Sequence, residues 1–333
     1  INIETPAGCV PRLPWQVWVT YSDGSKEWRQ TKWTNHMLST EQQEANPEMY
    51  PAGKEYTISG FIIGDNTTDN GYPITANIKV VAEEWKVPAP KAVAQTLPLS
   101  DVNILGSNRL SSNKHLAIKT ILSWDITQQL YNYRDTYGLP TEGYRTADGW
   151  DSPTTKLKGH GSGHYMSALA FAFASCTDPE TDLSKEKNEL RERIRRMVNE
   201  LRECQERTFV WDSTLNRYKE ARDYAPEEEL KKMKGNWAAF NEYKKDYKNY
   251  GYGYLNAIPA AHPALIECYR AYNNEEWVWA PYYTIHKQLA GLIDIANNID
   301  DKEIAAKALL IAKDMGLWVW NRMHYRTYVK ADG

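Results

Sequence analysis

Two histidines four residues apart stand in a glycine-rich stretch of this 333-residue sequence. His160 and His164 belong to the segment Gly-His-Gly-Ser-Gly-His, which leads into a run of alanine, phenylalanine and other apolar residues. If a helix begins early in this segment, the spacing of four places both imidazoles on one helix face. Such a pair could bind zinc, bond to backbone at the helix start, or contact a substrate.

Zinc binding is the least favoured of these three interpretations. The four-residue zinc motif of metalloproteases carries a glutamate directly after the first histidine, where it acts as the base. Gly161 occupies that position here, and no third ligand is evident nearby in the sequence. Backbone bonding and substrate contact both stay open, and no metal is assigned to His160 or His164.

The residues after His164 predict a helix in the protein interior. They are apolar nearly all the way round the helix, which is typical of a buried helix. The glycines before them suit a backbone that enters a tight space, and Ser162 is the expected N-cap. We therefore expect an interior helix that presents its first turn to a cavity.

Charge and aromatic composition limit the partners of the chain. The net charge of -3 gives no reason to expect nucleic acid or an acidic membrane surface. Trp (13) and Tyr (22) far outnumber Phe (5), so most aromatic rings carry a polar group. Such rings suit partly exposed sites, including platforms for sugar rings, although packing between helices would give the same composition.

The sequence shows neither a membrane-spanning run nor a signal peptide. Because the chain begins with Ile1, we expect a processed or trimmed start, and secretion stays open. The four cysteines are far apart and lack metal-ligand spacing. We interpret Cys176 and Cys204 as buried structural thiols in helices. The cysteines are Cys9, Cys176, Cys204 and Cys268.

Residues 1–82 are expected to form a small β-sandwich. Runs of β-forming residues at Trp15–Tyr21, Lys26–Trp33, Glu55–Ile63 and Ile74–Val81 are separated by turn signals, a spacing that favours a sandwich. The segment resembles a bacterial immunoglobulin-like domain, a common appendage of secreted bacterial enzymes that serves as a spacer or, less often, in binding. The matching residues are Pro6–Gly8, Pro11–Pro14, Val19–Gly24, Trp33, Tyr56–Gly60 and Ala76–Val80.

Residues 83–98 are expected to form a linker, because three prolines keep the segment extended and exclude a helix. Limited proteolysis should therefore cut between Glu83 and Pro98 and release a folded β fragment. Circular dichroism of that fragment checks the prediction, and a helical spectrum would contradict it.

From residue 99 onward the pattern is helical. One helix is expected over Ser111–Asp135, and an amphipathic helix over Leu183–Arg207. A short helix is expected over Ala264–Tyr272, and two closing helices over Tyr283–Ile299 and Lys302–Met323. Antiparallel helix pairs with long loops suggest an α/α toroid.

Four local motifs in this helical part carry a family resemblance. Together they look like the amino-terminal half of the β-L-arabinofuranosidase families, glycoside hydrolases 127 and 146. The resemblance covers residues 99–328, within which 209–250 looks like an insertion. The motifs are Leu99–Val102, Gly159–Ala170, Gly253–Pro259 and Ala280–Asp294.

The resemblance implies a six-hairpin α/α toroid that removes terminal β-L-arabinofuranose from plant-type arabinose-containing glycans with retention. In that family a cysteine nucleophile is held on zinc by further cysteines and a glutamate, and another glutamate is the acid/base. The Glu-x-Cys and Cys-Cys motifs for these groups do not occur in this sequence. We therefore expect a truncated toroid over 99–333, with catalytic residues beyond Gly333. The fragment itself is expected to be inactive and to bind no zinc.

The resemblance also supplies substrate-binding candidates. His286, with Tyr283 beside it, resembles a sugar-contacting histidine of the family. We expect His160 and His164 to converge with His286 on one pocket, and Trp150 lies in the loop before them. The expected partner is an oligosaccharide or polysaccharide, and the expected location is secreted, periplasmic or at the cell surface.

Two other classes of protein stay open. One is a non-catalytic carbohydrate-binding or scaffold protein of the same fold. The other is a different toroid hydrolase or lyase that uses paired carboxylates, for which Glu142, Asp148 and Asp151 are the candidates.

Overall fold

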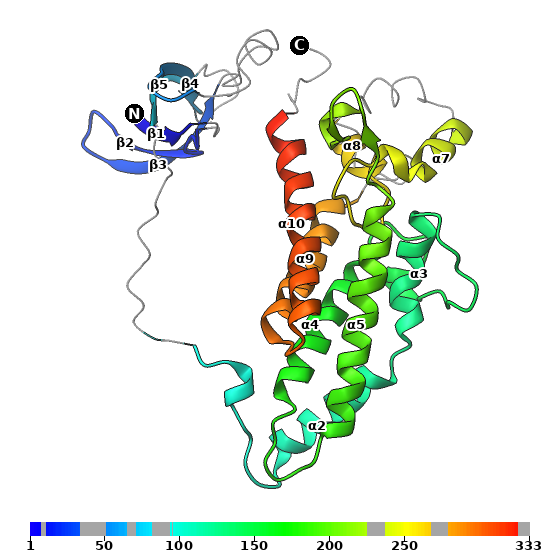
Figure 1. Ribbon diagram of the computed structural model, residues 1–333. Helices are drawn as coiled ribbons and strands as arrows, with labels where there is room; N and C mark the ends of the chain where they lie inside the picture. Colours follow the sequence, from blue (N-terminus) through cyan, green and yellow to red (C-terminus); the bar gives the residue numbers. More distant parts are fainter. Residues whose placement is uncertain are drawn as a thin grey trace. The chain divides into compact units, whose positions relative to one another are not determined.

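A sheet-rich N-terminal unit is followed by a helical unit (Figure 1). The computed structural model describes residues 1–7, 11–33, 51–64, 71–81, 94, 96–224, 237–267 and 279–325. The chain divides into two compact units, residues 1–94 and 95–333. In the described part of the chain, no helix combines the length and apolar character needed to cross a lipid bilayer.

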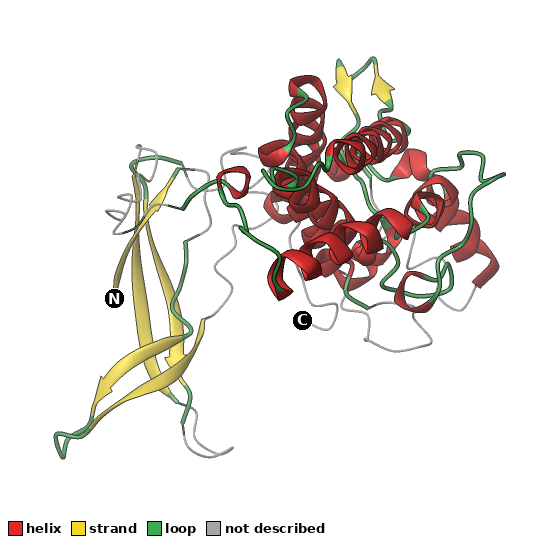
Figure 2. Ribbon diagram, turned by 90° about the horizontal axis from the view of Figure 1, so that it is seen from below, coloured by secondary structure: helices red, strands yellow, loops and turns green. Residues whose placement is uncertain are grey.

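The described strands of the N-terminal unit form one sheet in the order β1-β5-β4-β3-β2. They are drawn in yellow in Figure 2. β1, which the sequence analysis missed, is parallel to β5, and the other neighbours are antiparallel. Ile58, Ala76 and Ile78 form the buried core of this unit. The second layer of an immunoglobulin-like sandwich stays a prediction. The strands are β1 (Asn2–Pro6), β2 (Gln16–Thr20), β3 (Lys26–Trp33), β4 (Glu55–Ile62) and β5 (Tyr72–Val81).

The helical unit is built from long helices with a short hairpin and 3₁₀ turns between them. The expected helices over 183–207, 283–299 and 302–323 are confirmed to within two residues at each end. The helices are α2 (Arg109–Ser123), α3 (Ile126–Thr136), α4 (His160–Ser175), α5 (Ser184–Glu206), α7 (Trp237–Lys245), α8 (Ala261–Glu267), α9 (Pro281–Asn298) and α10 (Lys302–Tyr325). The hairpin is β6 (Trp211–Asp212) with β7 (Arg217–Tyr218), and the 3₁₀ turns are Leu99–Asp101, Gly149–Asp151, Ala221–Asp223 and Tyr247–Asn249.

The single helix expected over Ser111–Asp135 is wrong, because the chain breaks between α2 and α3. Trp124 ends α2 in an extended conformation. Asp125 then caps α3, since its carboxylate accepts from the backbone N–H of Thr127 at 2.9 Å and from the Thr127 hydroxyl at 2.7 Å. An aspartate that bonds to nearby backbone competes with helix continuation, which is the physical reason for the break.

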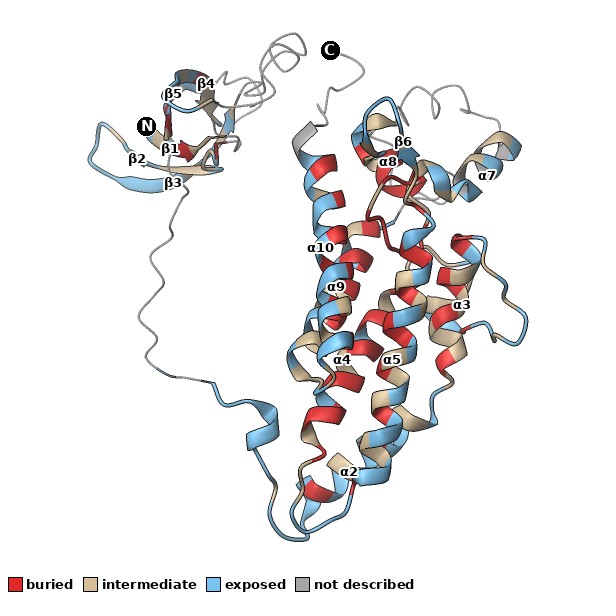
Figure 3. Cartoon of the chain, viewed as in Figure 1, coloured by how far each residue is buried: buried red, intermediate tan, exposed pale blue. Residues whose placement is uncertain are grey.

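α4 lies at the centre of the helical unit, where its buried residues pack against α9 and α5 (Figure 3). Met166, Leu169 and Phe173 are buried there. The expected burial on all sides is only partly confirmed, because His164 and Phe171 are exposed. These two residues are seven apart and share one helix face. α4 therefore leaves a strip open that begins at His164.

Small residues bring α4 and α9 into backbone contact. A Cβ atom at Gly163 would lie 2.5 Å from the carbonyl carbon and oxygen of Lys287, and one at Gly291 would lie 2.6 Å from the carbonyl oxygen of Gly163. Further along, the Ser167 hydroxyl donates to Asp294 at 2.6 Å. Because the contacts advance in the same direction along both helices, α4 and α9 are parallel and begin at the same end.

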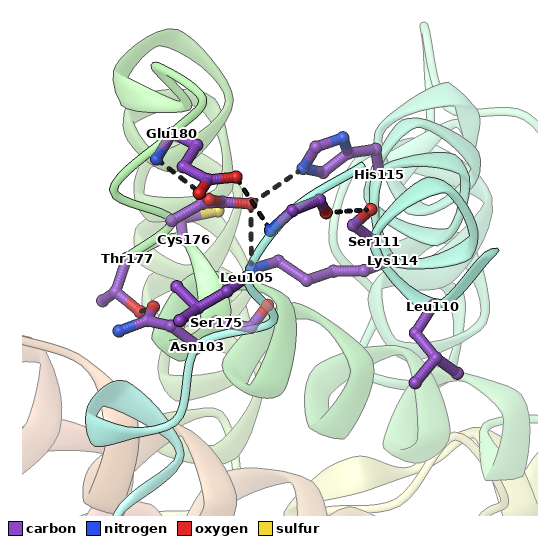
Figure 4. Close-up of polar contacts among 12 residues, drawn as sticks. Asn103, Leu105, Leu110, Ser111, Lys114, His115, Ser175, Cys176, Thr177 and Glu180 are labelled. Carbon is purple, nitrogen blue, oxygen red and sulfur yellow. Dashed lines mark hydrogen bonds and ion pairs between the residues drawn. The ribbon is translucent and has the colours of Figure 1, made fainter. Parts of the chain in front are cut away.

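Polar contacts fasten the far end of α4 to α2 (Figure 4). The Gly106 N–H donates to Glu180 at 2.8 Å, and the Thr177 hydroxyl donates to Asn103 at 2.9 Å. His115 lies 3.3 Å from Asp178, which follows the C-terminus of α4. These contacts place His115 at the opposite end of α4 from His160.

Candidate functional site

A glycine in the left-handed conformation starts α4. Gly159 is the N-cap with a φ of 93°, and a Cβ atom there would lie 2.6 Å from the Cβ of Ala257. A side chain at this position would therefore be strained and would clash. The expected N-cap role of Ser162 is wrong, because Ser162 lies within the first turn and its hydroxyl donates to the carbonyl of Gln129 at 2.8 Å.

The carboxylate of Asp151 connects the preceding loop to this helix start. Oδ1 accepts from the N–H of Gly159 at 2.6 Å, and Oδ2 accepts from the N–H of Gly161 at 3.1 Å. Oδ2 also lies 3.5 Å from Nδ1 of His160. The N-terminus of a helix favours a negative group, since its first N–H groups lack partners within the helix.

Aromatic rings surround His160. The ring centroid of His160 lies 5.7 Å from that of Trp150, 5.7 Å from that of His164 and 6.2 Å from that of Tyr283. Trp150 is 70% exposed and Tyr283 45% exposed, so part of each ring is open to solvent. The structure thus brings together four of the five residues that the sequence analysis proposed for substrate binding.

The fifth residue, His286, lies on α9 with Tyr283. Its side chain is exposed, and its charge is one of those that depress the pKa of His164. The ammonium group of Lys287 lies 5.0 Å from the centroid of the Tyr283 ring, so Lys287 packs on the site. The effect of His286 on the pKa of His164 agrees with the expected convergence of the three histidines on one pocket, which stays a prediction.

A layer of buried polar side chains lies beneath the histidines. Asn132 donates to the backbone carbonyl of Asp151 at 2.6 Å, and Gln288 donates to Asn256 at 3.0 Å. Tyr133 donates to the carbonyl of Gly159 at 3.2 Å. The sequence did not lead us to three of these residues, Asn132, Asn256 and Gln288. Asn132 and Gln288 could have been found as polar residues at helix positions that are otherwise apolar and buried.

Three buried polar atoms of this region make no hydrogen bond with the described residues: Asn132 Oδ1, His160 Nδ1 and Gln288 Oε1. The 3.5 Å contact of His160 Nδ1 with Asp151 meets the distance of an ion pair but not the geometry of a hydrogen bond. Buried polar atoms are nearly always bonded to protein or to water. Their grouping here is what a site for a small polar ligand or ordered water requires.

The electrostatics favour neutral His164. Burial lowers the pKa of His164, and the positive charges of Lys287 and His160 lower it further, while Asp151 opposes them. Burial raises the pKa of Asp151, although the N–H groups of Gly159 and Gly161 and the charge of His160 partly offset this. A neutral imidazole has one donor and one acceptor and can bond to two ligand hydroxyls.

The described residues do not fit a zinc site of the cysteine and glutamate type. Among them, no three histidine, cysteine, aspartate or glutamate side chains are placed to share an ion. The thiol of Cys176 donates to the carbonyl of Ala172 at 3.2 Å, and burial raises the pKa of both Cys176 and Cys204. Cys9 and Cys268 lie outside the described residues.

A carboxylate pair is not assembled from the three candidates either. Glu142 and Asp148 are exposed on the loop between α3 and α4. Asp151 lies 3.5 Å from His160, but its oxygens already accept from backbone N–H groups. This carboxylate holds the loop rather than facing a second carboxylate.

The structure thus shows a helical domain in which imidazole and aromatic side chains gather at the paired starts of α4 and α9. The family model described as the GH127 catalytic domain of β-L-arabinofuranosidase matches residues 101–330. The chain therefore belongs to this family of glycoside hydrolases, and the resemblance stated from the four motifs is confirmed. No curated protein and no solved structure matches the chain.

Proposed function

We propose that this chain recognises terminal β-L-arabinofuranose of plant-type glycans, for retaining hydrolysis by a secreted or cell-surface enzyme whose helices belong to an α/α toroid. The observation that carries the proposal is the contact of His160 with Trp150, His164 and Tyr283 at the paired starts of α4 and α9. The family match supports a carbohydrate as the substrate.

The site offers both kinds of contact that a sugar needs. The exposed rings of Trp150 and Tyr283 can pack against the apolar face of a sugar ring. Neutral imidazoles supply a donor and an acceptor for neighbouring hydroxyls. The polar atoms of Asn132 and Gln288 that lack partners lie beneath these rings and add acceptors to the same region.

In this proposal the described residues bind the substrate and do not cleave the glycosidic bond. A cysteine nucleophile must be a thiolate, and burial disfavours that form for Cys176 and Cys204. The cysteine nucleophile of the proposal is therefore neither Cys176 nor Cys204. The immunoglobulin-like N-terminal unit is proposed as a spacer.

Replacing His286 by alanine should weaken binding of methyl β-L-arabinofuranoside about 5- to 150-fold, because a lost hydrogen bond that leaves its partner unpaired costs about 1–3 kcal/mol. Isothermal calorimetry on the full chain measures the affinity, and thermal stability should stay nearly unchanged, since His286 is exposed. The matched control is His115→Ala, at the far end of α4. Equal affinities of His286→Ala and the unsubstituted chain would contradict the assignment.

One sequence feature favours a second candidate, a non-catalytic arabinoside-binding protein of the same fold. Neither a Glu-x-Cys nor a Cys-Cys motif occurs among the 333 residues. The same calorimetric samples, assayed for released methanol and arabinose, distinguish the two. Release that His286→Ala abolishes favours the hydrolase and contradicts the second candidate, whereas binding without release fits both the second candidate and a hydrolase whose catalytic groups lie outside the described residues.

A further inference from the structure

The carboxylate of Asp151 connects the loop before α4 to the start of that helix. It contacts three successive residues of the helix start. It accepts the N–H groups of Gly159 and Gly161, and it lies 3.5 Å from Nδ1 of His160 between them. On the loop side, the backbone carbonyl of the same residue accepts the amide of Asn132 at 2.6 Å. Asp151 is thus fixed from α3 and in turn fixes the start of α4.

The glycine at 161 makes room for this arrangement. A Cβ atom built on Gly161 would overlap Oδ2 of Asp151, the oxygen closest to His160. The residue is helical and needs no positive φ. The requirement for glycine at this position is therefore space for the carboxylate rather than backbone conformation.

The position of the carboxylate sets what His160 can present to a ligand. Nδ1 is buried and lies 3.5 Å from a carboxylate oxygen, a contact without hydrogen-bond geometry, so electrostatic attraction to the carboxylate favours a hydrogen on Nδ1. In a neutral imidazole, a hydrogen on Nδ1 leaves Nε2 as an acceptor. Nε2 can then receive a hydrogen bond from a ligand hydroxyl.

We infer that Asp151 is a positioning residue, which holds the His160 ring with its hydrogen on Nδ1 and leaves Nε2 as the acceptor for the ligand. The nature of that ligand rests on the proposed function, but the state of the ring does not. Asp151 touches no ligand in this scheme and acts through His160.

The other groups around Asp151 agree with this role. His160 and His164 face it from α4, Tyr133 interacts with it from α3, and Lys287 and His286 lie beyond His164 on α9. Burial is the largest influence on Asp151 and raises its pKa, while the charges of His160 and His164 favour the negative form. Two N–H bonds to the carboxylate favour its ionised form as well.

The test is nitrogen NMR of the histidine side chains on the full chain, with His160 assigned from the signals that disappear in His160→Gln. The spectrum at neutral pH should show the tautomer with hydrogen on Nδ1. In Asp151→Asn the side-chain amide can donate to Nδ1 while its oxygen still accepts from the glycines, so the hydrogen should move to Nε2. The matched control Asp148→Asn, on the same loop, should leave the spectrum unchanged.

Two results would overturn the inference: a wild-type His160 with hydrogen on Nε2, or an unchanged tautomer in a folded Asp151→Asn. The wild-type spectrum decides the matter by itself if the variant does not fold. Binding of methyl β-L-arabinofuranoside should weaken on the order of tenfold in Asp151→Asn. With its hydrogen on Nε2, His160 can no longer accept a hydrogen bond there from a ligand hydroxyl. If the unsubstituted chain binds no arabinoside, the proposed function is contradicted. The NMR spectrum still tests the role of Asp151 independently of that result.

Discussion

Replacing Arg202 by methionine is expected to lower the free energy of unfolding of the helical unit by about 3–5 kcal/mol. Arg202, on α5, donates to Oδ2 of Asp314 on α10 at 2.7 Å, and the side chain of Asp314 is only 3% exposed. Without the guanidinium group, the carboxylate keeps the hydrogen bond from the Tyr252 hydroxyl, at 3.1 Å, as its side-chain contact among the described residues. A buried charge with so little compensation strongly disfavours the folded state. Urea denaturation followed by circular dichroism measures the loss.

Glu192→Gln is the matched control on the same helix. Glu192 is an exposed partner of Arg195, and exposed ion pairs contribute about 0–1 kcal/mol. The double substitution Arg202→Met with Asp314→Leu should recover part of the stability, because both buried charges are then absent. A loss below about 1 kcal/mol for Arg202→Met would show that Asp314 is not buried as the structure describes.

Replacing Gly163 by alanine should destabilise the helical unit by about 1–3 kcal/mol, although alanine is the better helix former. The added methyl group would lie 2.5 Å from the backbone of Lys287, so α4 and α9 must separate. For a unit of this size, each kcal/mol corresponds to a decrease in melting temperature of about 2–4 °C. Differential scanning calorimetry measures the change.

Gly316→Ala provides the opposite case. Gly316 lies within α10, and a Cβ atom there would have no neighbour within 4 Å. The substitution should therefore stabilise the protein by up to about 1 kcal/mol through helix propensity alone. If both substitutions stabilise the chain, the close contact of α4 with α9 is not a feature of the folded protein.

Local patterns in the sequence were sufficient to predict most helices and strands. α5 has apolar residues at helical spacing opposite a dense charged face, and its predicted bounds differ from the observed ones by one residue at each end. The expected spacing of His160 and His164 on one helix face was also correct, because α4 begins at His160. These features are determined by residues that are close together in the sequence, so they can be predicted from one sequence.

The errors concern competition between local and distant contacts. Ser162 has the right side chain for an N-cap, but its hydroxyl donates to the distant carbonyl of Gln129, and the helix starts after Gly159 instead. Asp151 was considered as half of a carboxylate pair, and its bonds to Gly159 and Gly161 give it a different role. The approach of Gln288 to Asn256 joins α9 to a distant loop and leaves no local signal in the sequence.

The close crossing of α4 and α9 has a consequence for the thermodynamics of ligand binding. The site takes His160 and His164 from one helix and Tyr283 and His286 from the other, and near the crossing the two backbones touch at Gly163. The two halves of the site therefore cannot change their separation without breaking that contact. Ordering a loose side chain on binding costs about 0.5–1.5 kcal/mol, and a rigid frame reduces this loss of entropy. A hydroxyl-rich ligand should accordingly meet two helix starts that are already at their final separation, and selectivity among sugars of different ring size should depend on that separation.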